Sequence, residues 1–252
     1  MSNKIALVTG GSRGLGKNMA LHLAEKGIDV ILTYHSKQAE AAAVVGEIES
    51  KGQKAAALQL NVGETKSFDE FFDRVRRVLQ ENWNRETFDF LVNNAGAEAN
   101  GLIAETSEET FDFLLNIHFK GVFFLTQKAL PLIADGGRIV NLSSGLARFS
   151  SPGYAAYASM KGAIETFTRY LAKEAGARGI TANVVAPGII ETDFTREVFE
   201  HAPQVIKFIE SQTALGRTGV PDDIGGIVAF LCTEEARWIT AQRIEASGGM
   251  FI

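Results

Sequence analysis

Short β-branched runs alternate with longer helical patterns along nearly the whole chain. The expected strands cover residues 5–9, 29–34, 54–60, 88–92, 138–142, 181–186 and 243–246. The expected helices cover residues 15–26, 38–51, 67–82, 108–133, 154–177 and 222–233. Such alternation is typical of a parallel sheet with helices on both faces. We therefore predict an α/β fold, a Rossmann-type doubly wound parallel β-sheet of about seven strands.

Residues 192–219 depart from this rhythm, because they resemble two short helices more than one crossover helix. No linker rich in Pro, Gly and Ser and no internal repeat divides the chain, so we predict one domain over residues 1–252. Ligands of parallel sheets bind at the carboxyl ends of the strands. An insertion about 192–219, at that edge, is a candidate substrate lid.

Composition narrows the class of protein. The 252 residues carry a formal net charge of −5, which disfavours a nucleic-acid partner. The single cysteine, Cys232, excludes an internal disulfide and a cysteine-based metal cluster, and no metal is expected. No signal-like segment precedes the first strand, and no apolar run approaches the ~20 residues that span a bilayer. We expect a cytoplasmic protein without membrane contact.

A glycine-rich segment, residues 9–16, joins the first strand to the first helix. Glycines at this turn let backbone amides approach a pyrophosphate, and the helix N-terminus adds a favourable dipole. A plain glycine-rich turn is the alternative interpretation. The flanking strand and helix favour dinucleotide binding. The expected contacts are Gly10, Ser12, Arg13, Gly14, Leu15 and Gly16.

The end of the second strand indicates which dinucleotide binds. An acidic residue there would hold the ribose 2′-hydroxyl of NAD and repel a 2′-phosphate. Tyr34, His35 and Ser36 stand there instead, followed by Lys37, and Arg13 can reach toward the same ribose. We predict NADP(H) as the cofactor. The alternative is that Arg13 is solvated loop surface.

Tyr157 and Lys161, with Ser144 upstream, form a candidate acid–base group. Residues four apart on a helix lie on the same face. An ammonium beside a phenol favours the phenolate and lowers the phenol pKa from its usual ~10. Ser144 supplies a hydroxyl for a carbonyl or alcohol oxygen. An incidental Tyr and Lys on an exposed helix is the alternative, which the nucleotide fingerprint disfavours.

Six segments in order carry a family resemblance. They are the loop of residues 9–16, Asn93-Asn94-Ala95-Gly96, Asn116, Ser144, Tyr157-x-x-x-Lys161 and Pro187-Gly188. Over essentially its whole length the chain resembles the short-chain dehydrogenase/reductase family. Ser144 lies thirteen residues before Tyr157, the spacing of that family. Tyr154 lacks a lysine four residues on, and Ser143 misses the spacing by one.

The resemblance implies roles for four catalytic residues. Tyr157 would be the general acid in carbonyl reduction, and Lys161 would lower its pKa and bind the nicotinamide ribose. Ser144 would hydrogen-bond the substrate oxygen. Asn116 would bend its helix and hold a water that links Lys161 to solvent, unless it is a satisfied buried amide. The implied activity is reduction of a ketone with NADPH.

The resemblance also implies contacts to the cofactor. Asn94, Ala95 and Gly96 would pass beside the adenosine ribose. Asn61 and Val62 would face the adenine, with Asn61 in the place of the usual Asp. The nicotinamide side would begin at Pro187, Gly188, Ile190 and Thr192. Ser247 replaces the family's usual Asp near subunit contacts.

Two segments, together with Glu98, should surround the substrate: the loop after Ser144 and the 192–219 insertion. The candidates are Glu98, Gly145, Leu146, Phe149, Tyr154, Phe194 and Phe199. Their apolar composition favours a small-molecule ketone over a sugar or a phosphorylated substrate, although the aromatics can equally be lid packing. Reduction of a 3-oxoacyl group on acyl carrier protein is the alternative. An acidic carrier needs basic residues near the pocket, and residues 134–137 supply none.

Two further expectations concern assembly and class. Residues 108–133 and 154–177 are apolar on more than one face, which predicts burial against a partner. In the family these helices form a four-helix contact and the C-terminal strand a second, so a homotetramer is expected. A non-catalytic NADP-sensing protein is the alternative class, disfavoured because both Tyr157 and Lys161 are present.

Overall fold

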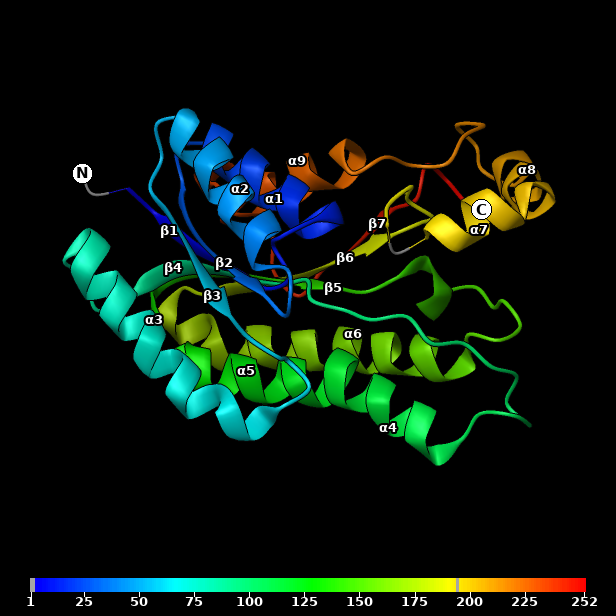
Figure 1. The fold of residues 1–252 in the computed structure, drawn as a ribbon, viewed down its shortest axis with the longest axis horizontal. Helices are drawn as coiled ribbons and strands as arrows, with labels where there is room; N and C mark the ends of the chain where they lie inside the picture. Colours follow the sequence, from blue (N-terminus) through cyan, green and yellow to red (C-terminus); the bar gives the residue numbers. More distant parts are fainter. Residues whose placement is uncertain (1–2, 194) are drawn as a thin grey trace.

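The computed structural model of the chain describes residues 3–193 and 195–252. Seven strands form one sheet in the order β3-β2-β1-β4-β5-β6-β7, and every neighbouring pair is parallel. The predicted Rossmann-type fold is confirmed (Figure 1). The strands are β1 Ile5–Val8, β2 Asp29–Tyr34, β3 Ala55–Gln59, β4 Phe88–Asn93, β5 Ile133–Leu142, β6 Thr181–Pro187 and β7 Arg243–Ala246.

Helices cover both faces of the sheet (Figure 1). One face carries α1 (Gly14–Glu25), α2 (Gln38–Ser50) and α9 (Asp222–Leu231). The other carries α3 (Phe68–Trp83), α5 (Gly121–Ala129) and α6 (Ala155–Ala175). Successive side chains of a strand point to opposite faces, so strands covered on both sides are apolar throughout. In β1, Ala6 and Val8 join the first core, and Ile5 and Leu7 the second.

Four buried polar side chains tie α5 and α6 to the sheet. Asn93 Nδ2 donates to Thr126 Oγ1 at 2.9 Å and to Asn141 Oδ1 at 2.8 Å. Asn141 Nδ2 in turn donates to Thr168 Oγ1 at 2.8 Å. Buried polar groups that find partners favour one arrangement over near alternatives. The network therefore fixes the position of α6 relative to β4 and β5.

The helix predicted over residues 108–133 is wrong as one element. The chain forms α4 (Glu108–Leu115), a π-helix (Asn116–Lys120), α5 and a short 3₁₀ turn, and Ile133 already begins β5. Pro131 has no amide hydrogen to continue the helix, and Ile133 pairs with Phe88 of β4. The apolar run of residues 130–133 thus belongs partly to a strand, which periodicity alone does not distinguish from a buried helix.

The segment after β6 contains the two short helices that the sequence predicted, α7 (Arg196–His201) and α8 (Pro203–Ser211). Both lie beyond the carboxyl end of the sheet (Figure 1). Phe208 of α8 contacts Phe251 of the C-terminal tail at a centroid distance of 6.2 Å. Phe251 in turn lies 4.8 Å from Phe149, in the loop after Ser144. These rings connect the insertion to the loop after β5.

Within residues 3–193 and 195–252, no helix has the length and apolar character needed to cross a bilayer. The same part of the chain holds no cluster of three or more His, Cys, Asp or Glu side chains arranged for a metal ion. Cys232 is buried, and burial raises the pKa of its thiol to about 12. Its sulfur is therefore protonated at neutral pH.

Candidate active site

The residues singled out by the sequence gather at the carboxyl edge of the sheet. Gly10 follows β1, Asn94 follows β4, Ser144 follows β5 and Gly188 follows β6. Strand order reverses between β1 and β4, and ligands of open α/β sheets bind in the crevice outside such a reversal. The fold thus brings the glycine loop and the candidate acid–base group to the same edge.

The glycine loop is held in close contact with neighbouring backbone. Gly10 has a φ of +66°, and a Cβ there would lie 2.9 Å from Cα of Ala95. A Cβ on Gly16 would lie 2.1 Å from the Gly10 carbonyl oxygen. Asn94 Nδ2 donates to the carbonyl oxygens of Thr9, at 2.9 Å, and Gly10, at 3.2 Å. The loop therefore presents backbone at the start of α1, which suits a pyrophosphate.

Arg13 stands immediately before α1, beside Ser12 and ahead of Gly14 and Leu15. Its side chain is 55% exposed and forms an ion pair with Asp193 at 3.6 Å. An exposed pair at this distance is weak, so the guanidinium can exchange Asp193 for a phosphate. Asp193 was not anticipated from the sequence as a neighbour of Arg13.

The end of β2 is open to solvent and carries no acidic side chain. Tyr34 is half-buried, whereas His35 and Ser36 are exposed. The carbonyl oxygen of His35 accepts a hydrogen bond from Gln59 at 2.9 Å. The arrangement leaves the side chains of residues 35 and 36 accessible to a ligand at the glycine loop.

The remaining cofactor candidates line the same edge. Asn61 Oδ1 accepts a hydrogen bond from Gly63 N at 3.0 Å and keeps a second lone pair for a ligand. Beside it, the Val62 carbonyl oxygen is covered by Gly121. After the buried Pro187, Gly188 N donates to Ala246 O at 3.1 Å, and Ile190 pairs with Gly219. Thr192 N donates to Thr195 Oγ1 at 3.1 Å.

Ser144, Tyr157 and Lys161 lie together. Tyr157 is in the first turn of α6 and Lys161 one turn later, only 6% exposed. Lys161 Nζ lies 5.5 Å from the Tyr157 ring centroid and donates to the Leu142 carbonyl oxygen at 2.8 Å. Ser144 Oγ accepts from Leu146 N at 3.2 Å and forms a hydrogen bond with Tyr157. The three side chains therefore form one group.

The expectation that Lys161 lowers the Tyr157 pKa is wrong for this structure. Burial raises the pKa of Tyr157 above its ordinary value; the hydrogen bond from Ser144 opposes the rise, and the charge of Glu98 adds to it. Burial lowers the pKa of Lys161 to about 8. Desolvation, which disfavours charged forms, is the largest cause of both pKa shifts. At neutral pH Tyr157 holds its proton, and Lys161 is largely an ammonium.

Contact with Tyr157 comes from His118, which the sequence analysis did not identify. The imidazole meets the Tyr157 ring edge to face, with centroids 5.0 Å apart at 83°. Asn116 stands two residues earlier, half-buried at the start of the π-helix. A π-helix begins at Asn116. The bend expected at this residue and its link to Lys161 stay predictions. A change of helix period is not visible in a local sequence pattern, which explains why His118 was missed.

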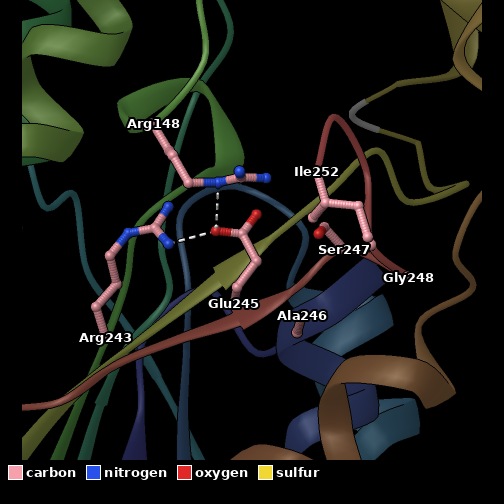
Figure 2. A pocket seen from close by; sticks show the side chains of 8 residues that line it. Arg148, Arg243, Glu245, Ala246, Ser247, Gly248 and Ile252 are labelled. Atoms are coloured by element: carbon pink, nitrogen blue, oxygen red, sulfur yellow. Dashed lines mark hydrogen bonds and ion pairs between the residues drawn. The ribbon is translucent and has the colours of Figure 1, made fainter. Parts of the chain in front are cut away.

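A network of hydrogen bonds and ion pairs holds the backbone at Ser144. Ser143 Oγ donates to Glu165 Oε1 at 2.7 Å, and Arg243 Nε donates to the same oxygen at 2.6 Å. Arg243 also donates to the Ser144 carbonyl oxygen at 3.2 Å and pairs with Glu245. Figure 2 shows Glu245 between Arg243 and Arg148. These ion pairs fix the backbone of Ser144.

The same ion pairs border a cavity of about 470 Å³, lined mainly by β7 and the C-terminal tail (Figure 2). Ser144, Tyr157 and Lys161 do not line it. This cavity therefore lies outside the group that could carry out chemistry, and we do not assign the substrate to it.

The substrate candidates lie at several places around Tyr157. Burial raises the pKa of Tyr154, and the negative charge of the exposed Glu98 also raises it. A Cβ on Gly145 would lie 2.7 Å from the Phe149 ring. Leu146, Tyr154 and Phe199 are half-buried. Phe194 lies outside the described residues.

Comparison with known proteins identifies the family. The model of a family described as Enoyl-(Acyl carrier protein) reductase matches residues 10–251, almost the whole chain. The chain belongs to the short-chain dehydrogenase/reductase family. The resemblance drawn from six short segments is thereby confirmed. Roles of single residues in this short-chain dehydrogenase/reductase remain predictions.

Two reductases from other organisms are similar to this short-chain dehydrogenase/reductase over almost their whole length. It is 38% identical to a 3-oxoacyl-[acyl-carrier-protein] reductase of Staphylococcus aureus, covering 99% of the chain and 98% of the relative. It is 35% identical to a hydroxynaphthalene reductase-like protein of Metarhizium brunneum, covering 99% and 95%.

Two solved structures are similar in sequence and fold. The reductase LugOII, described as promiscuous and as catalysing keto-reduction at C1 during lugdunomycin biosynthesis, superposes with a TM-score of 0.93 at 38% identity, covering 100% and 99% of the two chains. The angucycline C-6 ketoreductase LanV, with bound NADP, gives a TM-score of 0.93 at 38% identity, covering 98% and 95%.

Proposed function

We infer that the chain is an NADP(H)-dependent oxidoreductase that reduces a ketone to an alcohol. The observation that carries this inference is the grouping of Ser144, Tyr157 and Lys161 at the strand edge that also holds the glycine loop. Ketoreductases of similar sequence and fold, LugOII and LanV, support the reaction class.

The cofactor is NADP(H). The loop from Gly10 to Gly16 fits a pyrophosphate, since side chains at Gly10 or Gly16 would collide with neighbouring backbone. Arg13, with one of His35, Ser36 or Lys37, would hold the 2′-phosphate. No acidic side chain stands at the end of β2 to repel that phosphate. LanV, solved with NADP, supports this choice. When bound, NADPH supplies the hydride.

Three side chains control the transfer of a proton to the substrate oxygen. The raised pKa of Tyr157 keeps its proton on the phenol oxygen, ready for a substrate oxygen that gains negative charge. Ser144, whose hydroxyl already reaches the phenol, would hold the same substrate oxygen. Once Tyr157 has given up its proton, the Lys161 ammonium nearby stabilises the phenolate. Tyr157 thus acts as the general acid.

A small apolar ketone is the favoured substrate class. Leu146, Phe149 and Phe199, from the loop after β5 and from the insertion, supply the apolar candidates. Residues 192–219 act as the lid, within a single domain of residues 1–252. The ring contacts of Phe208 with Phe251, and of Phe251 with Phe149, support a connection between lid and loop.

A 3-oxoacyl group on acyl carrier protein is the second candidate. The 38% identity to the Staphylococcus reductase favours it. Docking of an acidic carrier requires free basic residues. Arg178 is paired with Asp135 at 2.8 Å, and Lys128 with Asp69 at 2.5 Å. These pairs neutralise two of the basic side chains that the carrier would need.

A panel of substrates distinguishes the two candidates. NADPH consumption is measured with aryl ketones, β-keto esters and an acetoacetyl thioester, each with and without acyl carrier protein. The favoured function predicts turnover of a free ketone that the carrier does not improve. Turnover confined to the carrier-bound thioester would favour the second candidate, and no turnover with any carbonyl would favour a non-catalytic NADP-sensing role.

The assembly is a homotetramer in the cytoplasm. An apolar groove of about 550 Å³ runs between α5 and α6, lined in part by Phe119, Phe123, Phe167 and Tyr170. Tyr170 is 66% exposed in the single chain, and Phe123 36%. Aromatic groups at such a surface are typical of an interface.

A further inference from the structure

His118 is a buried histidine in which Nε2 forms a hydrogen bond and Nδ1 has no hydrogen-bond partner among the described residues. Its side chain is 1% exposed, and Nε2 lies 2.7 Å from the Ala97 carbonyl oxygen. A carbonyl oxygen can only accept, so Nε2 carries the hydrogen. Ala97 N, at 3.4 Å from the same nitrogen, is the weaker contact. In the neutral ring, Nδ1 is therefore a hydrogen-bond acceptor.

The ring is neutral at physiological pH. Burial and, to a lesser extent, the charge of Lys161 lower the pKa of His118 to about 3. Nδ1 is buried and accepts no hydrogen bond from any described residue. A buried acceptor without a donor typically costs ~1–3 kcal/mol, so this nitrogen calls for a partner, which a water or a ligand can supply.

The imidazole has close neighbours. Its ring meets Tyr157 edge to face, and Gly96 is so near that a Cβ added there would lie 2.9 Å from Cε1. Tyr157 and Lys161, both on α6, are the titratable groups that face it, and the charge of Glu98 acts on Tyr157 from the preceding loop. The ring cannot turn without losing the hydrogen bond to the Ala97 carbonyl oxygen.

We propose that His118 is a positioning residue, which holds the Tyr157 ring and offers Nδ1 as an acceptor for a donor, such as a water, that is bound to the Lys161 ammonium. This role rests on the proposed function, in which Tyr157 delivers the proton and Lys161 stabilises the phenolate. It places His118, two residues beyond Asn116, in the polar connection to Lys161.

The tautomer is tested first, without any substrate. ¹⁵N spectra of enzyme labelled at histidine, assigned by loss of one signal pair in His118→Asn, should show a neutral ring protonated at Nε2. The Nδ1 resonance should move when Lys161 is replaced by Met and stay in place in Lys173→Met, an exposed lysine on the same helix. A protonated ring, or an Nδ1 signal indifferent to Lys161→Met, would overturn the proposal.

Two substitutions then distinguish the packing of the His118 ring against Tyr157 from its role as a hydrogen-bond acceptor. His118→Phe keeps a ring against Tyr157 and removes the acceptor, whereas His118→Asn keeps an acceptor and removes the ring. For ketone reduction by His118→Phe we expect kcat to fall roughly tenfold or more. The alkaline limb of its pH profile should move to lower pH, because the donor bound to the Lys161 ammonium loses its acceptor and the charged form of Lys161 becomes less stable. NADPH binding and melting temperature should stay close to the wild type.

His118→Asn should retain more activity than His118→Phe and keep the position of the alkaline limb. A wild-type rate and profile in His118→Phe, or a displaced limb in His118→Asn, would contradict the acceptor role. If His118→Phe does not fold, the position of the alkaline limb in the pH profile of His118→Asn tests the acceptor role by itself. If the wild type reduces no ketone, the proposed function fails, and the ¹⁵N spectra still decide the role of His118.

Discussion

Lys161 carries a charge that its surroundings disfavour. Burial lowers its pKa from 10.5 to about 8, which corresponds to about 3 kcal/mol against the charged form. A cation with a lowered pKa binds fewer protons in the folded than in the unfolded chain between these two values. The free energy of unfolding therefore rises with pH from about 8 to 10.5, and below about pH 8 the full cost remains.

Lys161→Met should remove that cost. We expect its free energy of unfolding at neutral pH to exceed that of the wild type by about 2–3 kcal/mol, with no rise between pH 8 and 10.5 from this residue. Urea unfolding across this pH range measures both effects. Lys173→Met, at an exposed position of the same helix, is the control. An unchanged pH slope in Lys161→Met would contradict the burial argument.

Arg13 determines the choice between NADPH and NADH in this account. A charge-assisted contact to phosphate contributes about 1.5–3 kcal/mol, so Arg13→Ala should lower the ratio of kcat/KM values for NADPH and NADH by about ten- to a hundredfold. Lys17→Ala, one turn further along α1 and paired with Glu47, is the control and should leave the ratio unchanged. A ratio unaffected by Arg13→Ala would mean that Arg13 is only solvated surface.

At the scale of the elements, the π-helix lets the chain pass close to the turn after β3. A Cβ on Gly121 would lie 2.2 Å from the Val62 carbonyl oxygen and 2.7 Å from that of Asn116. The π-helix also places His118 against Tyr157. Both atoms belong to the backbone and cannot rotate away as a side chain can, so the fit tolerates no side chain at residue 121.

Gly121→Ala should therefore lower the free energy of unfolding by about 3 kcal/mol or more, since overpacking of a tight contact costs about 1–3 kcal/mol and occasionally more. Gly46→Ala is the matched control, because Gly46 also lies within a helix and has nothing within 4 Å. It should raise stability by about 0.5–1 kcal/mol. Thermal melting of both variants tests the contact; equal effects would refute it.

Strands and most helices could be read from the sequence because local patterns specify them. The run from Ile5 to Val8 is apolar at every position, and all four residues are buried, as a doubly covered strand requires. The break at Asn116 and the start of β5 at Ile133 could not be read. They depend on contacts with Val62 and Phe88, which are distant in the sequence.

Some residues of the candidate site could likewise be predicted from the sequence, and others could not. The fixed spacings of the glycine loop and of Tyr157 and Lys161 identify residues that the fold brings together. The contacts of His118, Asp193 and Arg243 with them depend on tertiary packing, and no local motif marks these residues. The pKa of Tyr157 likewise depends on burial, which the spacing of two side chains does not reveal.

For the whole molecule, the groove between α5 and α6 determines the expected assembly. Tyr170→Glu would place a charge in an apolar interface and should convert the tetramer to smaller species, as measured by light scattering after gel filtration at low micromolar concentration. Ala43→Glu introduces the same charge on an exposed part of α2 and should leave the tetramer intact. A wild-type monomer would contradict the assembly itself.

Replacement of Tyr157 by Phe tests the central claim most directly. In Tyr157→Phe, ketone reduction should fall by about two to four orders of magnitude, while NADPH binding, followed by fluorescence titration, stays at the wild-type level. Tyr154→Phe should retain activity, since Tyr154 has no lysine four residues further along the helix. Wild-type turnover by Tyr157→Phe would show that another group delivers the proton.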